Sequence, residues 1–186
     1  MRYRRLLTIS AALVICACSG PVQEVSTEPG HDPGGTTVHA APRVDRPLDA
    51  TGAAACSILN PAQIAAAAMD SRTAEDRSNG IATACHWDSV DRSGGMTLTL
   101  NLDTSFDLVY TSREVIDGFA EISVRGFPGV REGPPGSSIC TVYTAVADTQ
   151  VFAVEVNSGS TDLAVRPCEV AEHAAGAVID SLSSRS

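Results

Sequence analysis

The chain has 186 residues and a formal net charge of −9, and its thirteen basic side chains are all arginine. The absence of lysine excludes a Walker-type phosphate loop, a Schiff-base enzyme and a Ser-x-x-Lys hydrolase, because each of them needs that side chain. The acidic balance disfavours nucleic acid and anionic lipid headgroups as partners.

The first 17 residues have the form of an export signal. Arg2, Arg4 and Arg5 supply positive charge, and residues 6–17 then form an apolar stretch. A helix of that length spans roughly 18 Å, which is too short for the ~30 Å hydrocarbon core of a bilayer. We therefore expect residues 1–17 to be a cleaved signal peptide and not a membrane-spanning helix.

Residues 15–18, Ile-Cys-Ala-Cys, resemble the lipobox of bacterial lipoproteins, in which an aliphatic residue, a tolerant position and a small residue precede the lipidated cysteine. Cys16 does not fit, because Ile15 would then occupy the position of the small residue. We expect Cys18 to carry a diacylglyceryl group and an N-acyl chain such as palmitate, which together anchor the chain on the extracytoplasmic face of the cell membrane. The alternative is an ordinary secretory signal cut near Ala17, which would leave Cys18 as a free thiol.

Removal of the signal takes three arginines away and moves the net charge from −9 to −12. Residues 18–44 then hold the lipidated cysteine and a stretch rich in Ser, Thr, Pro and Gly, which predicts a disordered tether. Its ends would lie roughly 30 Å apart as a flexible coil and at most ~85 Å apart when extended. The remaining residues, 45–186, are long enough for a single domain with its own core.

Helix and strand signals follow along this domain. A helix is expected from residue 61 to about residue 69, because Asn60 suits the N-cap, Pro61 the first turn and Gln63 the capping box. The segments 72–80 and 125–129 predict a loop and a turn. The other elements are expected as strands at 81–90 and 96–102, a helix at 106–117, strands at 121–124, 138–147 and 150–157, and a helix at 167–183.

Periodicity indicates which sides of these elements are buried. In residues 96–102 and 150–157, apolar side chains alternate with others, so Glu155 is expected on the opposite side of its strand from Val154. The buried stripe of the last helix is expected to consist of Val170, Ala174, Val178 and Leu182. The pattern predicts an α+β fold in which three helices pack on one face of an antiparallel sheet of about five strands.

Four cysteines lie within the predicted domain: Cys56, Cys85, Cys140 and Cys168. An even number in an exported domain predicts two disulfides, for which three connectivities exist. Sequential pairing, Cys56 with Cys85 and Cys140 with Cys168, is favoured because it closes two loops of nearly equal length and fastens a helix end to a strand in each. A zinc site is the alternative, although no two of these cysteines have C-x-x-C spacing.

Several short motifs together resemble the actinobacterial lipoproteins grouped as domain of unknown function 3558. They are Cys56-Ser57-Ile58-Leu59-Asn60-Pro61-Ala62-Gln63, Cys85-His86-Trp87, Gly126-Phe127-Pro128-Gly129, Cys140, and Pro167-Cys168 before an alanine-rich helix. The resemblance covers residues 45–183, and it departs from the family at Ala55, where a proline is frequent. An Ala-, Gly- and Arg-rich composition without lysine also suggests a GC-rich, actinobacterial genome. Because the family has no established activity, the resemblance implies no catalytic residue.

Two histidines in the domain are candidates for chemistry. His86 lies between Cys85 and Trp87 on a predicted strand, so we expect it to face outward while its two neighbours face the core. His173 lies four residues after Glu169 on the last predicted helix, where an acid–base pair is possible but an exposed contact is the interpretation we favour. No hydrolase, metalloprotease or dinucleotide motif occurs, and we expect no catalytic residue, no metal site and no cofactor.

The sequence thus favours a non-enzymatic lipoprotein of the cell envelope, which binds an envelope protein or a small ligand outside the membrane. One alternative is an envelope hydrolase whose Ser/His or acid–base site is assembled in space. Another is a sensory or regulatory accessory lipoprotein. The glycine-containing loops 126–129 and 133–136 are the first candidates for mutation.

Overall fold

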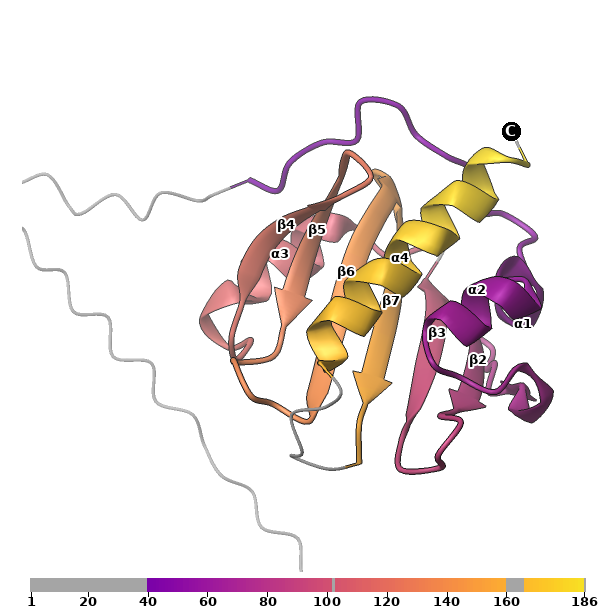
Figure 1. Ribbon diagram of the computed structural model, residues 1–186. Coiled ribbons are helices and arrows are strands. Elements are labelled where there is room, and N and C mark those ends of the chain that lie inside the picture. The colour runs from indigo at the N-terminus through magenta and orange to yellow at the C-terminus, as the bar shows by residue number, and fades with distance from the viewer. Residues whose placement is uncertain (1–39, 102, 160–165, 186) are drawn as a thin grey trace, which may run out of the picture. The chain divides into compact units, whose positions relative to one another are not determined.

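The computed structural model describes residues 40–101, 103–159 and 166–185 (Figure 1). The expected signal peptide, Cys18 and most of the expected tether lie outside the described residues. The elements are α1 Ala55–Ile58, α2 Pro61–Ala66, η1 Ser71–Thr73, β1 Glu75–Asp76, β2 Thr83–Asp88, β3 Gly95–Asn101, α3 Phe106–Thr111, η2 Ser112–Glu114, β4 Ala120–Val124, β5 Phe127–Glu132, β6 Ile139–Ala147, β7 Gln150–Asn157 and α4 Pro167–Ser183. The labels η1 and η2 denote short 3₁₀ helices.

All strands belong to one antiparallel sheet with the order β1-β2-β3-β7-β6-β5-β4. Strand β7, the last in sequence, lies between β3 and β6, so it joins the meander β1–β2–β3 to the meander β4–β5–β6. The predicted α+β class and antiparallel sheet are confirmed. The predicted numbers are wrong: the described residues contain seven strands and four α-helices, where about five strands and three helices were expected.

Of the two additional strands, β1 lies in the predicted loop 72–80 and β5 begins in the predicted turn 125–129, while the additional helix α1 lies where no element was predicted. Strand β1 has only two residues, both exposed and acidic. Strand β5 contains Pro128, which pairs with β4, whereas pairing of β5 with β6 begins at Gly129. A proline at that place removes no hydrogen bond from the β5–β6 ladder. Arg125 and Gly126 form the two-residue β4–β5 turn, and their φ angles of 53° and 86° have the sign that a type I′ hairpin requires.

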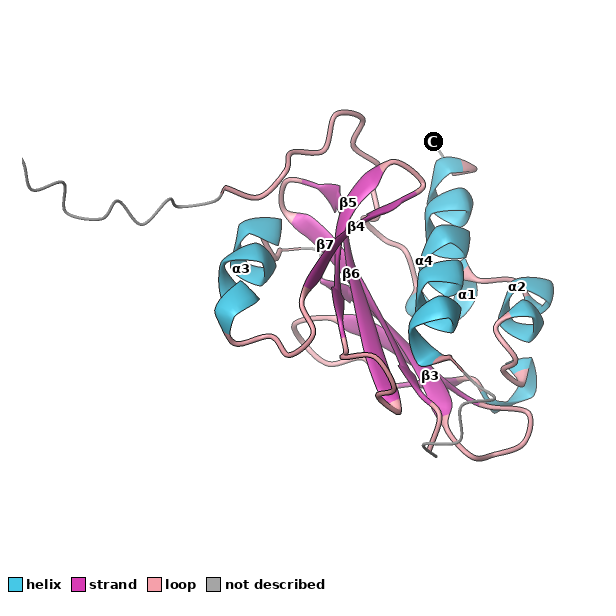
Figure 2. Cartoon of the chain, turned by 60° about the vertical axis from the view of Figure 1, so that its left-hand side comes forward, coloured by secondary structure: helices cyan, strands magenta, loops and turns pink. Residues whose placement is uncertain are grey.

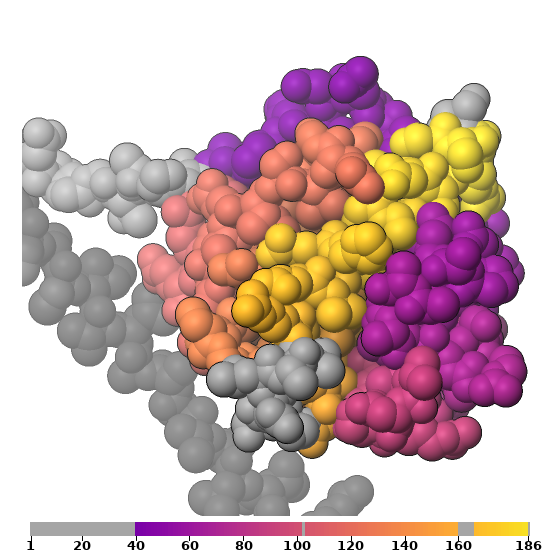
Figure 3. Space-filling view, viewed as in Figure 1, coloured from indigo at the N-terminus to yellow at the C-terminus, as the bar shows by residue number. Residues whose placement is uncertain are grey.

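Helices cover both faces of the sheet. Figure 3 shows α4 lying beside the α1–α2 region on one face, and a large apolar cluster lies between these helices and the sheet. Helix α3 lies on the opposite face (Figure 2), where Phe106 and Tyr110 pack on Val130, Ala145 and Val151. The expectation of helices on one face is therefore wrong for α3, because periodicity identifies the buried side of a helix but not the sheet face that it contacts.

The larger cluster forms the main core. Trp87, Met96 and Leu98 are completely buried at its centre, and the alternation predicted for residues 96–102 is confirmed over β3. In α4, the predicted stripe is confirmed: Ala174, Val178 and Leu182 are buried, while the partly buried Val170 packs against the cluster. Burial of a side chain such as Val178 or Leu182 contributes about 1.5–3 kcal/mol.

The predicted capping box begins α2. The Asn60 side chain accepts hydrogen bonds from the Ala62 and Gln63 N–H groups, and Gln63 Oε1 accepts one from the Asn60 N–H at 2.8 Å. The amide of Gln63 also donates to the Ala177 carbonyl at 3.3 Å and to Ser181 at 3.2 Å. This cap therefore fixes the start of α2 and joins α2 to α4.

Helix α2 ends at Ala66, earlier than the predicted residue 69. The N–H of Met69 donates to the Ile64 carbonyl, and the N–H of Ala68 donates to the Ala65 carbonyl. These are the two hydrogen bonds of a Schellman motif, which needs a left-handed residue after the helix. Ala68 occupies that position with a φ of 60°, although glycine is the usual residue there.

Two disulfides connect helices to strands. Cys56 of α1 is joined to Cys85 of β2, and Cys140 of β6 is joined to Cys168 in the first turn of α4, each with a Cα–Cα distance of 5.0 Å. This is the sequential connectivity that the sequence favours over the other pairings and over a zinc site. The two links fasten α1 and the start of α4 to the sheet.

Candidate functional site

Helix α3 covers only part of its side of the sheet (Figure 2). Beyond α3, the side chains of β2, β3 and β7 that point away from α4 are for the most part half-buried or exposed, and the adjoining parts of β5 and β6 continue this surface. We call this surface the open face. Its members, from β2 to β5, are His86, Thr97, Thr99, Ala153, Glu155, Thr141, Tyr143 and Glu132.

A row of directly paired residues crosses the open face. His86 pairs with Thr97, Thr97 with Glu155, Glu155 with Thr141, and Thr141 with Glu132. Neighbouring strands are about 4.8 Å apart, so the row extends over roughly 19 Å. Glu155 stands at the centre of the row between two threonines, and Glu132 stands at one end, so the half of the row from β7 to β5 is acidic.

A hollow of about 440 Å³ lies at the acidic end of this row, over β5, β6 and β7. Its polar walls include Asp117, Glu132 and Glu155, and Ile139, whose side chain is 45 % exposed, lies at its border. Tyr143 also lines it and donates a hydrogen bond to Glu132 Oε2 at 3.0 Å. The hollow therefore combines three carboxylates, one phenol and one exposed apolar side chain.

Burial, together with the negative charge of Glu132 and the hydrogen bond to it, raises the pKa of Tyr143 to about 12. Glu155 contributes in the same direction. The hydroxyl therefore stays protonated at neutral pH and acts as a hydrogen-bond donor to Glu132. Such a site can accept a cationic group, because its carboxylates and carbonyls offer acceptors and no arginine lines it.

His86 faces away from the core, as predicted, while Cys85 and Trp87 on either side are completely buried. Its Nδ1 lies 3.0 Å from Thr97 Oγ1, and its Nε2 lies 3.5 Å from Asp88 Oδ1. A Cβ atom on Gly95 would lie 2.6 Å from the imidazole Cε1, so the ring occupies space that only glycine leaves free. Hydroxyl, imidazole and carboxylate thus form a short series on the open face.

His173 is exposed on α4, on the other face of the sheet. Glu169 pairs with Arg166 at 2.7 Å, and Glu172 pairs with Arg131 at 3.3 Å. Both glutamates near His173 are therefore engaged by arginines, and the structure does not bring His173 together with His86.

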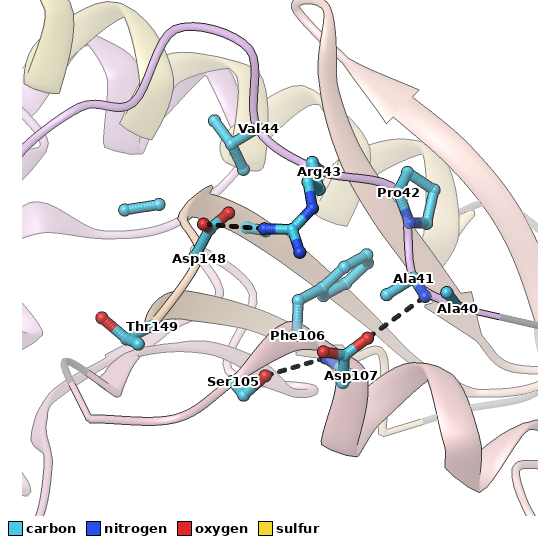
Figure 4. Close-up of a pocket in the computed structure, with 12 residues that line it drawn as sticks. Ala40, Ala41, Pro42, Arg43, Val44, Ser105, Phe106, Asp107, Asp148 and Thr149 are labelled. Atoms are coloured by element: carbon cyan, nitrogen blue, oxygen red, sulfur yellow. Dashed lines mark hydrogen bonds and ion pairs between the residues drawn. The ribbon is translucent and has the colours of Figure 1, made fainter.

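Residues 40–44, which we call the docked segment, belong to the expected tether but lie against the domain (Figure 4). The Ala41 N–H donates to Asp107 Oδ1 at 3.2 Å, and Arg43 pairs with Asp148 at 3.4 Å. Ala41 and Val44 pack against the apolar cluster of α3, and a hollow of about 290 Å³ lies between the segment, Phe106 and the β6–β7 turn. The Arg43–Asp148 pair is exposed and stabilises the segment by at most about 1 kcal/mol.

Of the two loops that sequence analysis selects, residues 126–129 form the β4–β5 turn and the start of β5. Residues 133–136 connect β5 to β6, and Gly133 and Pro134 line the acidic hollow. A Cβ atom on Gly133 would lie 2.9 Å from the Ile139 carbonyl oxygen, and its φ is 135°. Only glycine fits this close approach of the loop to β6.

Within the described ranges, no group of three or more His, Cys, Asp or Glu side chains is arranged to hold a metal ion. In the same part of the chain, no helix has the length and apolar character needed to cross a bilayer.

The acidic hollow is not predicted by the sequence, although part of its signal is present there. The alternation in residues 150–157 places Glu155 away from the core, as β7 confirms. Glu132 and Tyr143 could not be joined to it, because the sequence predicts a turn at 125–129 and no strand at 130–132, so the pairing of β5 with β6 was not foreseen. Only the register between the strands shows that these three side chains lie at one site.

The sequence model of one family, described as protein of unknown function (DUF3558), matches residues 13–181. No curated protein and no solved structure matches the chain. The match covers most of the sequence, so the chain belongs to this family.

Proposed function

We propose that this member of the DUF3558 family is a cell-envelope lipoprotein, held in the membrane by lipid on Cys18, whose domain is a non-enzymatic binding module outside the membrane. The lipobox-like sequence at residues 15–18 supports the anchor. The open face supports the binding role and is the observation that carries it, because a polar sheet surface with an acidic hollow is available on a domain braced by two disulfides.

The arrangement of the chain supports display of that face. Twenty-one residues of Pro-, Gly- and Ser-containing sequence, 19–39, separate Cys18 from the first described residue. The docked segment holds the chain against α3, on the same side of the sheet as the open face, so the length of residues 19–39 is what supports display of that face.

Metabolic labelling tests the anchor. Cells expressing the full chain are grown with labelled palmitate and separated into membrane and soluble fractions, alongside Cys18→Ser and Cys16→Ser variants. We expect label and membrane association in the parent and in Cys16→Ser, and loss of both in Cys18→Ser. A Cys18→Ser protein that stays in the membrane fraction would contradict lipid anchoring at this residue.

Site-specific photo-cross-linking tests the binding role. A photoreactive residue is placed at Thr99 on the open face and, as a matched control, at Thr51, which is exposed and away from the open face. We expect a discrete cross-linked product from Thr99 in intact cells and none from Thr51. Equal products from both positions, or none from Thr99, would argue against the open face as the binding surface.

A hydrolase is the second candidate, and the series Thr97–His86–Asp88 is the observation that favours it. It ranks second because Thr97 lies in the middle of β3, which pairs with strands on both sides. Backbone N–H groups engaged in a sheet do not form an oxyanion hole. A fluorophosphonate probe should label the parent chain but not Thr97→Ala if this candidate is right; absence of label from the parent dismisses it.

A further inference from the structure

We infer that the open face binds a basic, extended peptide segment of a partner protein, one arginine or lysine side chain of which enters the acidic hollow. This inference rests on the proposed function and names the ligand chemistry of the same surface. Three features carry it: the charge of the surface, the spacing of its carboxylates and its shape.

The three carboxylates of the hollow line one site and have no arginine partner among the described residues. Six arginines form ion pairs in the described residues, and their partners are Asp148, Asp70, Glu75, Asp180, Glu172 and Glu169. None of these pairs includes Asp117, Glu132 or Glu155. The hollow therefore holds concentrated negative charge that the described part of the chain does not neutralise, which favours a cationic partner.

The spacing of these carboxylates favours an arginine or lysine side chain of the ligand over a metal ion. Glu132 and Glu155 lie on β5 and β7 and both pair with Thr141 of β6, so their Cα atoms are roughly 10 Å apart. A metal ion at 2.3–2.6 Å from each oxygen would need the carboxylates to converge. A guanidinium or ammonium group on a long stem fits between them and reaches both, and a guanidinium has donors on two sides.

The shape of the surface favours an extended segment. Thr97, Thr99 and Ala153 are short side chains on β3 and β7, so the surface is low between His86 and Glu155, while Ile139 provides an apolar contact at the hollow. The second acidic position, Asp88 beside His86, lies at the other end of the row. A row of roughly 19 Å corresponds to about six residues of extended peptide.

Fluorescence anisotropy tests the inference on the full-length chain carrying Cys18→Ser, which removes the proposed lipidation site. The probes are a labelled nine-residue peptide with arginine at every third position and alanine elsewhere, and the same peptide with glutamate in place of arginine. At physiological salt the Debye length is about 8 Å, so distant charges contribute little. We expect the arginine peptide to bind and the glutamate peptide not to bind.

Two double variants distinguish binding at the hollow from a general attraction of the basic peptide to the acidic protein. Glu132→Gln with Glu155→Gln removes two charges from the hollow, and Asp45→Asn with Glu114→Gln removes two exposed charges elsewhere that form no described ion pair. We expect the first pair to weaken binding of the arginine peptide about tenfold and the second to change it less than about twofold. Urea midpoints of both variants establish that each is folded.

Equal weakening by the two double variants, or no binding of the arginine peptide, overturns the inference. Spermidine that displaces the peptide at equal charge concentration also overturns it, because the site would then recognise a small polyamine. If the peptide fails to bind while the photoreactive residue at Thr99 still captures a product, the peptide inference falls and the binding-module proposal stands.

Discussion

Loss of the Cys140–Cys168 disulfide is expected to lower the free energy of unfolding by about 3.6 kcal/mol. The bridge closes a loop with a sequence separation of 28 residues. Loop-closure entropy for that length is about 12 cal/mol/K, which corresponds to about 3.6 kcal/mol at 25 °C. The stabilisation acts by restricting the unfolded chain, so its size depends on loop length more than on the helix that the bridge holds.

The second disulfide provides a matched comparison. Cys56–Cys85 closes a loop with a separation of 29 residues, so the same reasoning predicts the same loss of about 3.6 kcal/mol. The two bridges hold very different helices, since α1 has 4 residues and α4 has 17. Each bridge has one almost fully buried cysteine, Cys85 or Cys140, so the cost of truncation to alanine is also matched.

The assay is equilibrium unfolding in urea, under oxidising conditions, of Cys140→Ala/Cys168→Ala and of Cys56→Ala/Cys85→Ala in the Cys18→Ser chain. The dependence of the free energy on urea should become steeper in both, because an unfolded chain without the bridge exposes more surface. A loss below about 1 kcal/mol, an unchanged slope, or losses that differ by more than about 2 kcal/mol would refute the loop-closure reasoning.

Three further outcomes follow from local geometry. Ala68→Gly should raise the free energy of unfolding by about 0.5–1 kcal/mol, because relief of the strain of alanine at a φ of 60° outweighs the greater entropy that glycine gives the unfolded chain. A lower urea midpoint in the variant contradicts this. Tyr143 should ionise near pH 12 in an ultraviolet titration, with stability falling as pH rises above about 10, and Glu132→Gln should lower that pKa; ionisation of the parent near pH 10 contradicts this. Hydrogen bonds from Ser89 and Ser93 lower the pKa of Asp91 to about 2, so its contribution to stability is present above about pH 4 and is lost as pH falls toward 2; Asp91→Asn should flatten that part of the urea-midpoint profile, and an unchanged profile contradicts this.

Local signals in the sequence predict a large part of the fold. The capping residues at Asn60 and Gln63 place the start of α2, and alternation in residues 96–102 and 150–157 places β3 and β7 with the correct sides buried. Nearly equal loop lengths and helix ends fastened to strands favour the sequential cysteine pairing, which the structure contains. Each of these features depends on residues close in sequence or on the distance along the chain between two cysteines.

The rest depends on contacts that local patterns do not contain. Pro128 and Gly129 have the composition of a turn, yet β5 forms because β4 and β6 provide partners on both sides. Nothing in the periodicity of α3 indicates that Phe106 packs on the opposite face from α4. The open face and its hollow need the register of β5, β6 and β7 together, so only the assembled sheet brings Glu132 and Glu155 to one site.

Our central proposal is that Cys18 carries lipid at the N-terminus of the mature chain, whose four other cysteines are all paired. Intact-mass spectrometry of the protein extracted from membranes tests it most directly, with thiol alkylation before and after reduction. We predict a chain that begins at Cys18, carries acyl groups, shows no alkylation before reduction and shows four alkylated cysteines afterwards. A chain that retains residues 1–17, or one in which Cys18 is alkylated before reduction, would contradict the claim.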